Sequence, residues 1–177
     1  LLGTNEAFIE QMSKKPDLKW DYPDPLFGPN VKDPFDAAQI AKQEIFSSKD
    51  FIILYNYRPI VDAHILILAK DRNCKTFADL SPEAFQQAHK IARMITAKLR
   101  QEGQEAYINH ANGSISGQTV PRWHMHIIIG SRYELCKGYL CMIGKMLNLS
   151  RSLSDADLQN RIKFYKEKIG HLESEQV

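Results

Sequence analysis

The sequence predicts an α+β fold, in which helices cover one side of an antiparallel β-sheet. Short apolar runs rich in β-branched residues alternate along the chain with segments whose apolar residues recur at helical spacing. The chain has 177 residues, of which 44% are hydrophobic, so it is long enough and apolar enough for a single domain with a proper core. No internal repeat or low-complexity tract in the sequence suggests another architecture.

The first 35 residues are predicted to form an irregular arm. Prolines are frequent there, and each removes a backbone hydrogen-bond donor and restrains the residue before it. A helix is predicted directly after this arm, from Asp36 to Ser47, because alanines and isoleucines fall at helical spacing in that segment.

The next segments predict two adjacent strands followed by the longest helix. Phe51–Tyr55 and His64–Ala69 are short apolar runs, and the turn-like sequence Asn56–Pro59 lies between them. Ser81 is followed by a proline, which is a typical N-cap and first helical residue. Helical periodicity then continues until Gly103, so we expect one long helix here.

The second half of the chain predicts a strand, a loop, a strand and a final helix. The strands are Glu105–Asn109 and Val120–Ile129, and a segment rich in Gly, Ser and Asn connects them. Ser154 fits the N-cap position of a C-terminal amphipathic helix. We expect residues 36–132 to form the core of the domain and residues 133–177 to be a helical extension of the same domain.

Three cationic or titratable side chains fall on one face of the last of these strands. Side chains alternate between the two faces of an extended strand, so Arg122, His124 and His126 are predicted to share a face. Trp123 and Met125 then belong to the opposite face and to the core. A functional site on this strand is therefore the favoured interpretation.

Two alternate histidines suit a metal ion, a general base or a nucleophile, and the spacing alone does not choose among these uses. A metal site needs at least a third ligand, and the guanidinium of Arg122 would repel a divalent cation on its own face. The same guanidinium would attract a phosphate. We therefore favour an anion site, and the alternative is a metal-dependent enzyme with His64, His124 and His126 as ligands.

The loop Gly113–Gly117 strengthens the case for an anion. Glycines let backbone N–H groups approach a phosphate closely, and Ser116, Gln118 and Thr119 add side-chain donors. Loops of this composition are usually simple turns. The significance of this one comes from its place directly before the strand that carries His124.

Two blocks of the chain resemble the histidine-triad (HIT) superfamily. Residues 117–128, Gly-Gln-Thr-Val-Pro-Arg-Trp-His-Met-His-Ile-Ile, are similar to the family signature, a Gly-Gln-Ser/Thr-Val lead into alternate histidines and apolar residues. Residues 56–67 are similar to the family's earlier strand-turn-strand element, in which a histidine precedes an apolar strand. The resemblance covers residues 36–132. It implies a HIT-like antiparallel sheet with a long helix and a shorter helix packed on it. The C-terminal helix is predicted in addition, from the sequence pattern after Ser154.

The fragile-histidine-triad branch, whose members hydrolyse diadenosine polyphosphates, is the nearest in character. Asn56 stands where that branch has an asparagine that binds the ribose. By the same resemblance, His124 corresponds to the nucleophilic histidine, and His126 to the third histidine, which orients the nucleophile and contacts phosphate. His64 corresponds to the upstream histidine that borders the same site.

The resemblance also assigns the segment before the strand to substrate binding. Gln118 and Thr119 match the polar pair that binds phosphate oxygens and the leaving group. Ser116 and Gly117 complete the predicted substrate-binding set.

Two positions depart from the family pattern. Arg122 occupies the place of the first histidine, and arginine donates well to phosphate but cannot shuttle protons at neutral pH. Ala111 falls where relatives often have a glutamine or asparagine that touches the phosphate or bridging oxygen. Asn109 and Asn112 are the candidates to replace that amide.

The resemblance implies an enzyme that cleaves a (di)nucleoside polyphosphate at the α-phosphate through a nucleotidyl-histidine intermediate. The catalytic set is His124, His126, Arg122 and His64. The alternatives are a nucleoside phosphoramidate hydrolase and a nucleotide-binding sensor with little turnover. We expect no cofactor bound by the protein, although the substrate can carry Mg²⁺, and the resemblance implies a homodimer.

The nucleoside is expected to lie against the strands and the helix that precede the predicted site. Phe35, Ile40 and Phe46 are candidates to contact the base, or are core residues.

Composition limits the partners and the location. Lys and Arg total 23 against 21 for Asp and Glu, a net charge of +2, so we expect neither a nucleic acid nor a membrane as a partner. The three cysteines have no spacing typical of zinc sites or disulfide frameworks. No apolar run reaches the roughly 18 residues that cross a bilayer. We therefore expect a soluble, cytoplasmic protein.

Overall fold

The structure is a computed structural model that describes residues 35–112, 118, 120–137 and 153–172. These residues form an α+β fold with a five-stranded sheet in the order β1-β2-β3-β5-β4, and every strand pair is antiparallel. The predicted fold class is therefore confirmed. The predicted arm lies outside the described residues, except for Phe35.

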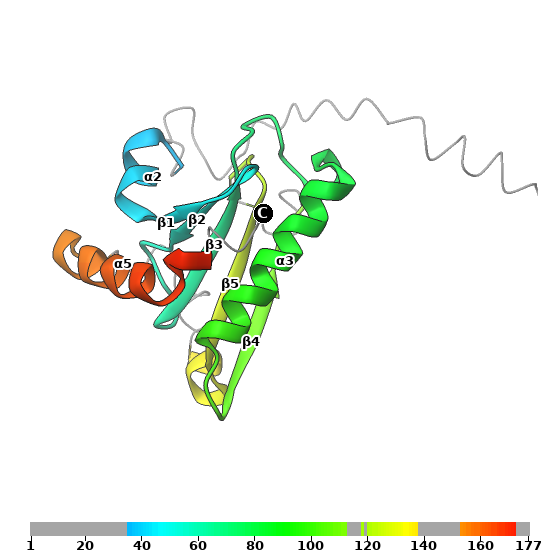
Figure 1. The fold of residues 1–177 in the computed structure, drawn as a ribbon. Coiled ribbons are helices and arrows are strands. Elements are labelled where there is room, and N and C mark those ends of the chain that lie inside the picture. The colour runs from blue at the N-terminus through cyan, green and yellow to red at the C-terminus, as the bar shows by residue number, and fades with distance from the viewer. Residues whose placement is uncertain (1–34, 113–117, 119, 138–152, 173–177) are drawn as a thin grey trace, which may run out of the picture. The chain divides into compact units, whose positions relative to one another are not determined.

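The strands are β1 (Glu44–Ser47), β2 (Phe51–Tyr55), β3 (Ala63–Ala69), β4 (Gln104–Asn109) and β5 (His124–Ser131). The helices include α2 (Ala37–Gln43), α3 (Pro82–Leu99), α5 (Asp155–Ile169) and the short 3₁₀-helix η1 (Phe77–Asp79). In Figure 1, α3 lies along β5 and β4, while α5 lies beside β1. None of the described helices combines the length and the apolar character needed to cross a membrane.

The long helix α3 forms as its sequence predicts. The Ser81 hydroxyl accepts a hydrogen bond from the backbone N–H of Ala84, and Pro82 opens the first turn. The helix ends at Leu99, and Gly103 takes the positive φ of 76° that the following turn requires. Its buried residues recur at helical spacing and face the sheet: Ala84, Ala88, Ile91, Ala92 and Ile95.

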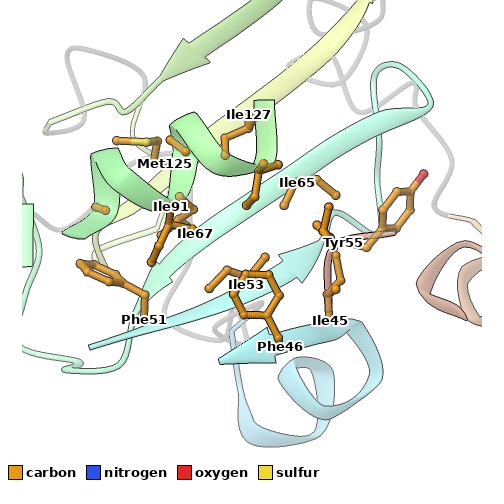
Figure 2. Packing of buried hydrophobic residues seen from close by; sticks show 14 of the residues in the cluster. Ile45, Phe46, Phe51, Ile53, Tyr55, Ile65, Ile67, Ile91, Met125 and Ile127 are labelled. Atoms are coloured by element: carbon orange, nitrogen blue, oxygen red, sulfur yellow. The ribbon is translucent and has the colours of Figure 1, made fainter. Parts of the chain in front are cut away.

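The main core lies between one face of the sheet and the helices α3 and α5. Strand residues of alternate positions supply it from the sheet side, and Figure 2 shows Phe51, Ile67 and Met125 around Ile91 of α3. The C-terminal helix adds a second set of buried side chains, which are Leu158, Ile162, Tyr165 and Ile169.

The other face of the sheet carries a smaller apolar cluster. Phe35 and Val120 pack there with side chains of β2 and β3, and Ile40 of α2 packs against them. Helices α3 and α5 thus contribute to the main core, as predicted for one side of the sheet, whereas the short helix α2 contacts the opposite face.

Two predicted elements need correction. The helix predicted for residues 36–47 ends at Gln43, because Glu44 adopts an extended conformation and residues 44–47 join the sheet as β1. The strand predicted to start at Val120 begins only at His124. Before it, the N–H of Arg122 donates to the carbonyl of Val120, which is a tight turn that an extended strand cannot make.

Candidate active site

The pairing of β3 with β5 brings histidines from both strands to one face of the sheet. Leu66 lies opposite His126 and Leu68 lies opposite His124 in the antiparallel register. His64 is two residues before Leu66, so it is a diagonal neighbour of His126 on the same face. The structure therefore brings together the three histidines that the sequence predicts for the site.

His124 is oriented by a backbone carbonyl. Its Nδ1 lies 2.8 Å from the carbonyl oxygen of Arg122, and because a carbonyl only accepts, Nδ1 carries the hydrogen. A neutral ring with its hydrogen on Nδ1 has a lone pair on Nε2. The ring is only 8% exposed.

Burial lowers the pKa of His124, and the hydrogen bond to the Arg122 carbonyl opposes this effect only in part. The ring is therefore neutral at neutral pH. A neutral imidazole whose free nitrogen is Nε2 is a nucleophile or a general base.

The tautomer of His64 follows from its donors. The backbone N–H of Ile60 donates to its Nδ1 at 3.2 Å, so Nδ1 carries no hydrogen. A neutral His64 is then protonated on Nε2, which lies 2.9 Å from Nδ1 of His126 and donates to it. A neutral His126 in turn carries its hydrogen on Nε2, and it presents an N–H donor.

Asn56 supports this arrangement. The N–H of Arg58 donates to its Oδ1 at 3.0 Å, which fixes the orientation of the amide and directs Nδ2 to the His64 ring. Nδ2 lies 3.3 Å from Nδ1 and 3.1 Å from Nε2 of that ring. The amide nitrogen thus contacts the His64 ring close to both of its nitrogens, while the Ile60 N–H determines which of them carries the hydrogen.

The rings of the site are in contact with one another. His124 and His126 meet edge to face with 5.1 Å between ring centroids, and His64 and His126 lie 5.2 Å apart. Phe35 presents a T-shaped contact to His124 at 5.2 Å. The nucleophile candidate thus sits between a titratable ring and an apolar one.

The structure adds backbone contacts of Arg122 that the sequence does not predict. Arg122 precedes β5, and its guanidinium donates to the carbonyls of Ala69 at 2.7 Å, Lys70 at 3.0 Å and Phe35 at 3.4 Å. The residue is only 4% exposed. Strict alternation therefore does not extend to this residue, and each of its three guanidinium nitrogens donates to a backbone carbonyl.

Gln118 also differs from its prediction as a donor to phosphate. Both hydrogens of its Nε2 are directed at backbone carbonyls, those of Lys75 and Val120, each at 2.8 Å. These contacts hold the segment before β5 against the segment before η1. The other predicted substrate-binding residues of this segment, Ser116, Gly117 and Thr119, lie outside the described residues.

The two asparagines proposed to replace the amide missing at Ala111 have different surroundings. Asn112 accepts the N–H of Phe77 and donates to the carbonyl of His110. Asn109, an exposed residue at the end of β4, lies directly opposite His126 in the β4–β5 register. Directly opposed residues project on the same face, so Asn109 is on the face of the site.

Other predicted side chains lie in the core. Trp123 and Met125 are fully buried on the α3 side of the sheet, as predicted. Phe46 belongs to the main core rather than to the face of the site, which removes it as a candidate for base contact. His110 stacks against Trp123 at 5.9 Å, on the side of the sheet away from His124.

The backbone N–H of Ile60 is the group of the site that sequence reasoning missed. No residue type marks a backbone donor, and only the fold of the turn between β2 and β3 directs it at His64. Among the described residues, no group of three or more His, Cys, Asp or Glu side chains is arranged to hold a metal ion.

This fold and these clustered histidines define a class of protein. Residues 37–133 match the HIT domain family, which is more than half of the chain, so the chain belongs to that family.

The curated relatives include a bis(5'-adenosyl)-triphosphatase of Saccharomyces cerevisiae, 30% identical over 103 residues, which are 57% of this chain and 49% of the yeast protein. An uncharacterized HIT-like protein of Mycoplasma genitalium is 26% identical over 102 residues, 56% of this chain and 70% of that protein. The matched region is thus only about half the length of the yeast enzyme.

Solved structures share the fold. The NitFhit protein of C. elegans aligns with a TM-score of 0.56 at 20% identity, over 72% of this chain and 27% of that one. The diadenosine triphosphate hydrolase of Plasmodium falciparum, solved with cyclomarin A, aligns with a TM-score of 0.54 at 17% identity, over 75% of this chain and 79% of that one.

The lowered pKa of His124 predicts a pH dependence of stability. Between that lowered pKa and the ordinary value of 6.5, the unfolded chain binds more protons than the folded one. The free energy of unfolding of the wild type should therefore fall as the pH drops below about 6.5, and the His124→Gln variant should lose less over the same window. Urea unfolding at several pH values between about 5 and 7 measures this difference. His110, whose pKa burial also lowers, contributes to both proteins and cancels in the comparison. Identical pH slopes would contradict a neutral, buried His124.

Proposed function

We propose that this protein is a nucleotidyl hydrolase that cleaves a dinucleoside polyphosphate at the α-phosphate through a nucleotidyl-histidine at His124. The observation that carries the proposal is the bond from His124 Nδ1 to the Arg122 carbonyl on a buried ring, because it leaves Nε2 unprotonated. Membership of the HIT family supports the reaction class. The similarity to a yeast bis(5'-adenosyl)-triphosphatase supports the choice of a dinucleoside substrate.

In the first step, Nε2 of His124 attacks the α-phosphorus. The N–P bond forms as the P–O bond to the departing nucleotide breaks, and the departing oxygen takes the electron pair. The ring becomes cationic for as long as it holds the nucleotidyl group. The carbonyl of Arg122 stabilises that charge through its bond to the Nδ1 hydrogen.

The departing oxygen is met by the Nε2–H of His126. That hydrogen is on Nε2 because His64 donates to Nδ1 of the same ring. The chain of donors runs from the Ile60 N–H through His64 to His126, so the proton sits on the nitrogen that can face substrate. In the second step, water attacks phosphorus from the side of the departed group, and a P–O bond forms as the N–P bond breaks. The electron pair of that bond returns to Nε2 of His124, and the proton of the water is released to solvent.

The nucleoside is proposed to lie near Phe35 and the apolar cluster on the face of the site. Phe35 contacts the His124 ring, and Ile40 borders the same cluster. Asn56 Oδ1 has a second lone pair besides the one that accepts the Arg58 N–H, so it can accept a ribose hydroxyl, as the family resemblance implies. The protein itself is proposed to bind no cofactor, and Mg²⁺ would arrive with the polyphosphate.

The variant His124→Ala should lower turnover of diadenosine triphosphate by at least about a thousandfold, while its affinity for the nucleotide stays within about tenfold of wild type, because the nucleophile acts mainly in the chemical step. His89→Ala is the matched control, since His89 is exposed on α3 and bonds to the carbonyl of Phe85 within its own helix. Steady-state kinetics and equilibrium binding give the two quantities.

Trapping identifies the intermediate directly. Substrate labelled in the α-phosphate, quenched under denaturing alkaline conditions that preserve an N–P bond, should leave label on His124 of the wild type and none on the alanine variant. Binding without hydrolysis by the wild type would favour the nucleotide sensor, and a higher kcat/KM for an adenosine phosphoramidate would favour the phosphoramidate hydrolase. Turnover by His124→Ala at the wild-type rate would exclude this mechanism.

Asn109 is proposed to contact the departing group, because it lies across from His126 on the face of the site. Asn109→Ala should lower kcat/KM for diadenosine triphosphate by about tenfold, the effect of one hydrogen bond to a charged group. Asn112→Ala is the matched control, since its amide holds Phe77 and His110 instead. Equal effects of the two substitutions would argue against a specific contact from Asn109.

We also propose a homodimer that uses the edge of β4, which is an outer strand of the sheet that the described residues form. This strand ends the sheet, and it exposes Tyr107 at 48% and Ile108 at 44%. Exposed apolar side chains on an unpaired edge favour association. Sedimentation analysis should show a dimer that Ile108→Glu converts to monomer, whereas Phe164→Glu, at an exposed apolar position of α5, should leave it intact. A monomeric wild type at micromolar concentration would contradict the dimer.

A further inference from the structure

Arg122 is a buried cation, and each of its three guanidinium nitrogens donates to a backbone carbonyl near the site. Its Nε, Nη2 and Nη1 reach the carbonyls of Ala69, Lys70 and Phe35. Ala69 and Lys70 lie at the end of β3, and Phe35 directly precedes the N-cap residue of α2. Ala69 is 53 residues and Phe35 is 87 residues before Arg122 in the sequence. One planar guanidinium thus joins three distant segments.

The main chain of Arg122 is fixed as firmly as its side chain. Its N–H donates to Val120 at 2.8 Å, and the N–H of the next residue, Trp123, donates to the carbonyl of Cys74 at 2.7 Å. The peptide unit that contains the Arg122 carbonyl is therefore held at both ends. That carbonyl is the one that accepts the hydrogen of His124 Nδ1.

The guanidinium reaches the nucleophile by a second route. It donates to the carbonyl of Phe35, and the ring of Phe35 packs edge to face on His124. The imidazole is thus restrained by a hydrogen bond on one side and by an aromatic contact on the other. Both restraints lead back to the same buried residue, one through its main-chain carbonyl and the other through its guanidinium.

We propose that Arg122 is a positioning residue: it acts through its own carbonyl and through Phe35 to hold His124 in the tautomer and orientation that aim Nε2 at the phosphorus. This inference rests on the proposed function. Arginine suits the task because its planar fork carries five donors in fixed directions, whereas a lysine ammonium is a compact point charge on a flexible stem. The residue touches neither substrate nor the reacting atoms in this role.

The test compares Arg122→Met and Arg122→Lys with Arg72→Met, a substitution at an exposed arginine. The first readout needs no substrate: ¹⁵N chemical shifts of the His124 ring report which nitrogen carries the hydrogen. We expect one tautomer, with the hydrogen on Nδ1, in the wild type and in Arg72→Met. We expect a mixture of both tautomers in Arg122→Met and a smaller admixture in Arg122→Lys.

The second readout separates positioning from phosphate binding. A misaligned nucleophile should lower kcat on the order of a hundredfold in Arg122→Met with KM within about threefold of wild type, and Arg122→Lys should recover part of the loss. A raised KM with unchanged kcat would overturn the proposal in favour of direct phosphate contact. An unchanged tautomer in both variants would overturn it as well.

The two readouts also separate this proposal from the proposed function. If the wild type shows no turnover, the proposed function fails, while the tautomer measurement still decides whether Arg122 orients His124. If Arg122→Met does not fold, Arg122→Lys decides through the same shifts, because it keeps the charge and most of the volume. A lysine variant with the wild-type tautomer and the wild-type kcat would then overturn the proposal.

Discussion

The antiparallel register of β3 and β5 is the constraint on which the site depends. Each strand buries alternate side chains against α3 and α5, and the residues between them project on the opposite face. Met125 and Ile127 anchor β5 in the core, so His124 and His126 must face the other way. A slip of one residue would exchange the two sets and place both imidazoles in the hydrophobic interior. The register of the histidines is thus stabilised by hydrophobic burial on the opposite face of the sheet, the face that packs against α3 and α5.

The turn between β2 and β3 determines which ring nitrogens of His64 and His126 carry a hydrogen, and the C-terminal helix supports this turn. The hydroxyls of Tyr55 and Tyr165 both donate to the carbonyl of Asp62, and Arg161 forms an ion pair with the carboxylate of that residue. Burial is the main cause that raises the pKa of Tyr55 to about 12, so its hydroxyl keeps the hydrogen that it donates. Because Ile60 lies in the same turn, α5 helps to direct the N–H that sets the tautomer of His64. Helix α5 lies beyond residues 37–133, which match the family.

The parts of the site that follow from strand periodicity could be predicted, and the parts that depend on long side chains or on backbone groups could not. Alternation along β5 placed Trp123 and Met125 in the core and His124 and His126 together. It gave no account of the Arg122 guanidinium, because the strand begins after that residue and a long, flexible side chain can reach the backbone carbonyls of Ala69, Lys70 and Phe35. It also failed for residues 44–47, where isoleucine at helical spacing fits a helix as well as a strand. There, burial of Ile45 and Phe46 and pairing with β2 decide the outcome.

Arg122 occupies the position of the first histidine of the family pattern, and this changes which residues of the site can exchange protons. A histidine there could exchange protons, whereas a guanidinium stays charged at any pH at which the protein is folded. In the proposed mechanism, proton transfer falls to His126, whose hydrogen is placed on Nε2 by the donors that run from the Ile60 N–H through His64. A buried cation is costly to desolvate, and three carbonyls offset that cost only while they stay in place. The same bonds that stabilise the charge therefore hold the end of β3, Phe35 and the start of β5 in one arrangement. In the proposed mechanism, Arg122 therefore provides rigidity around His124 at a position where a histidine would provide a proton-transfer group.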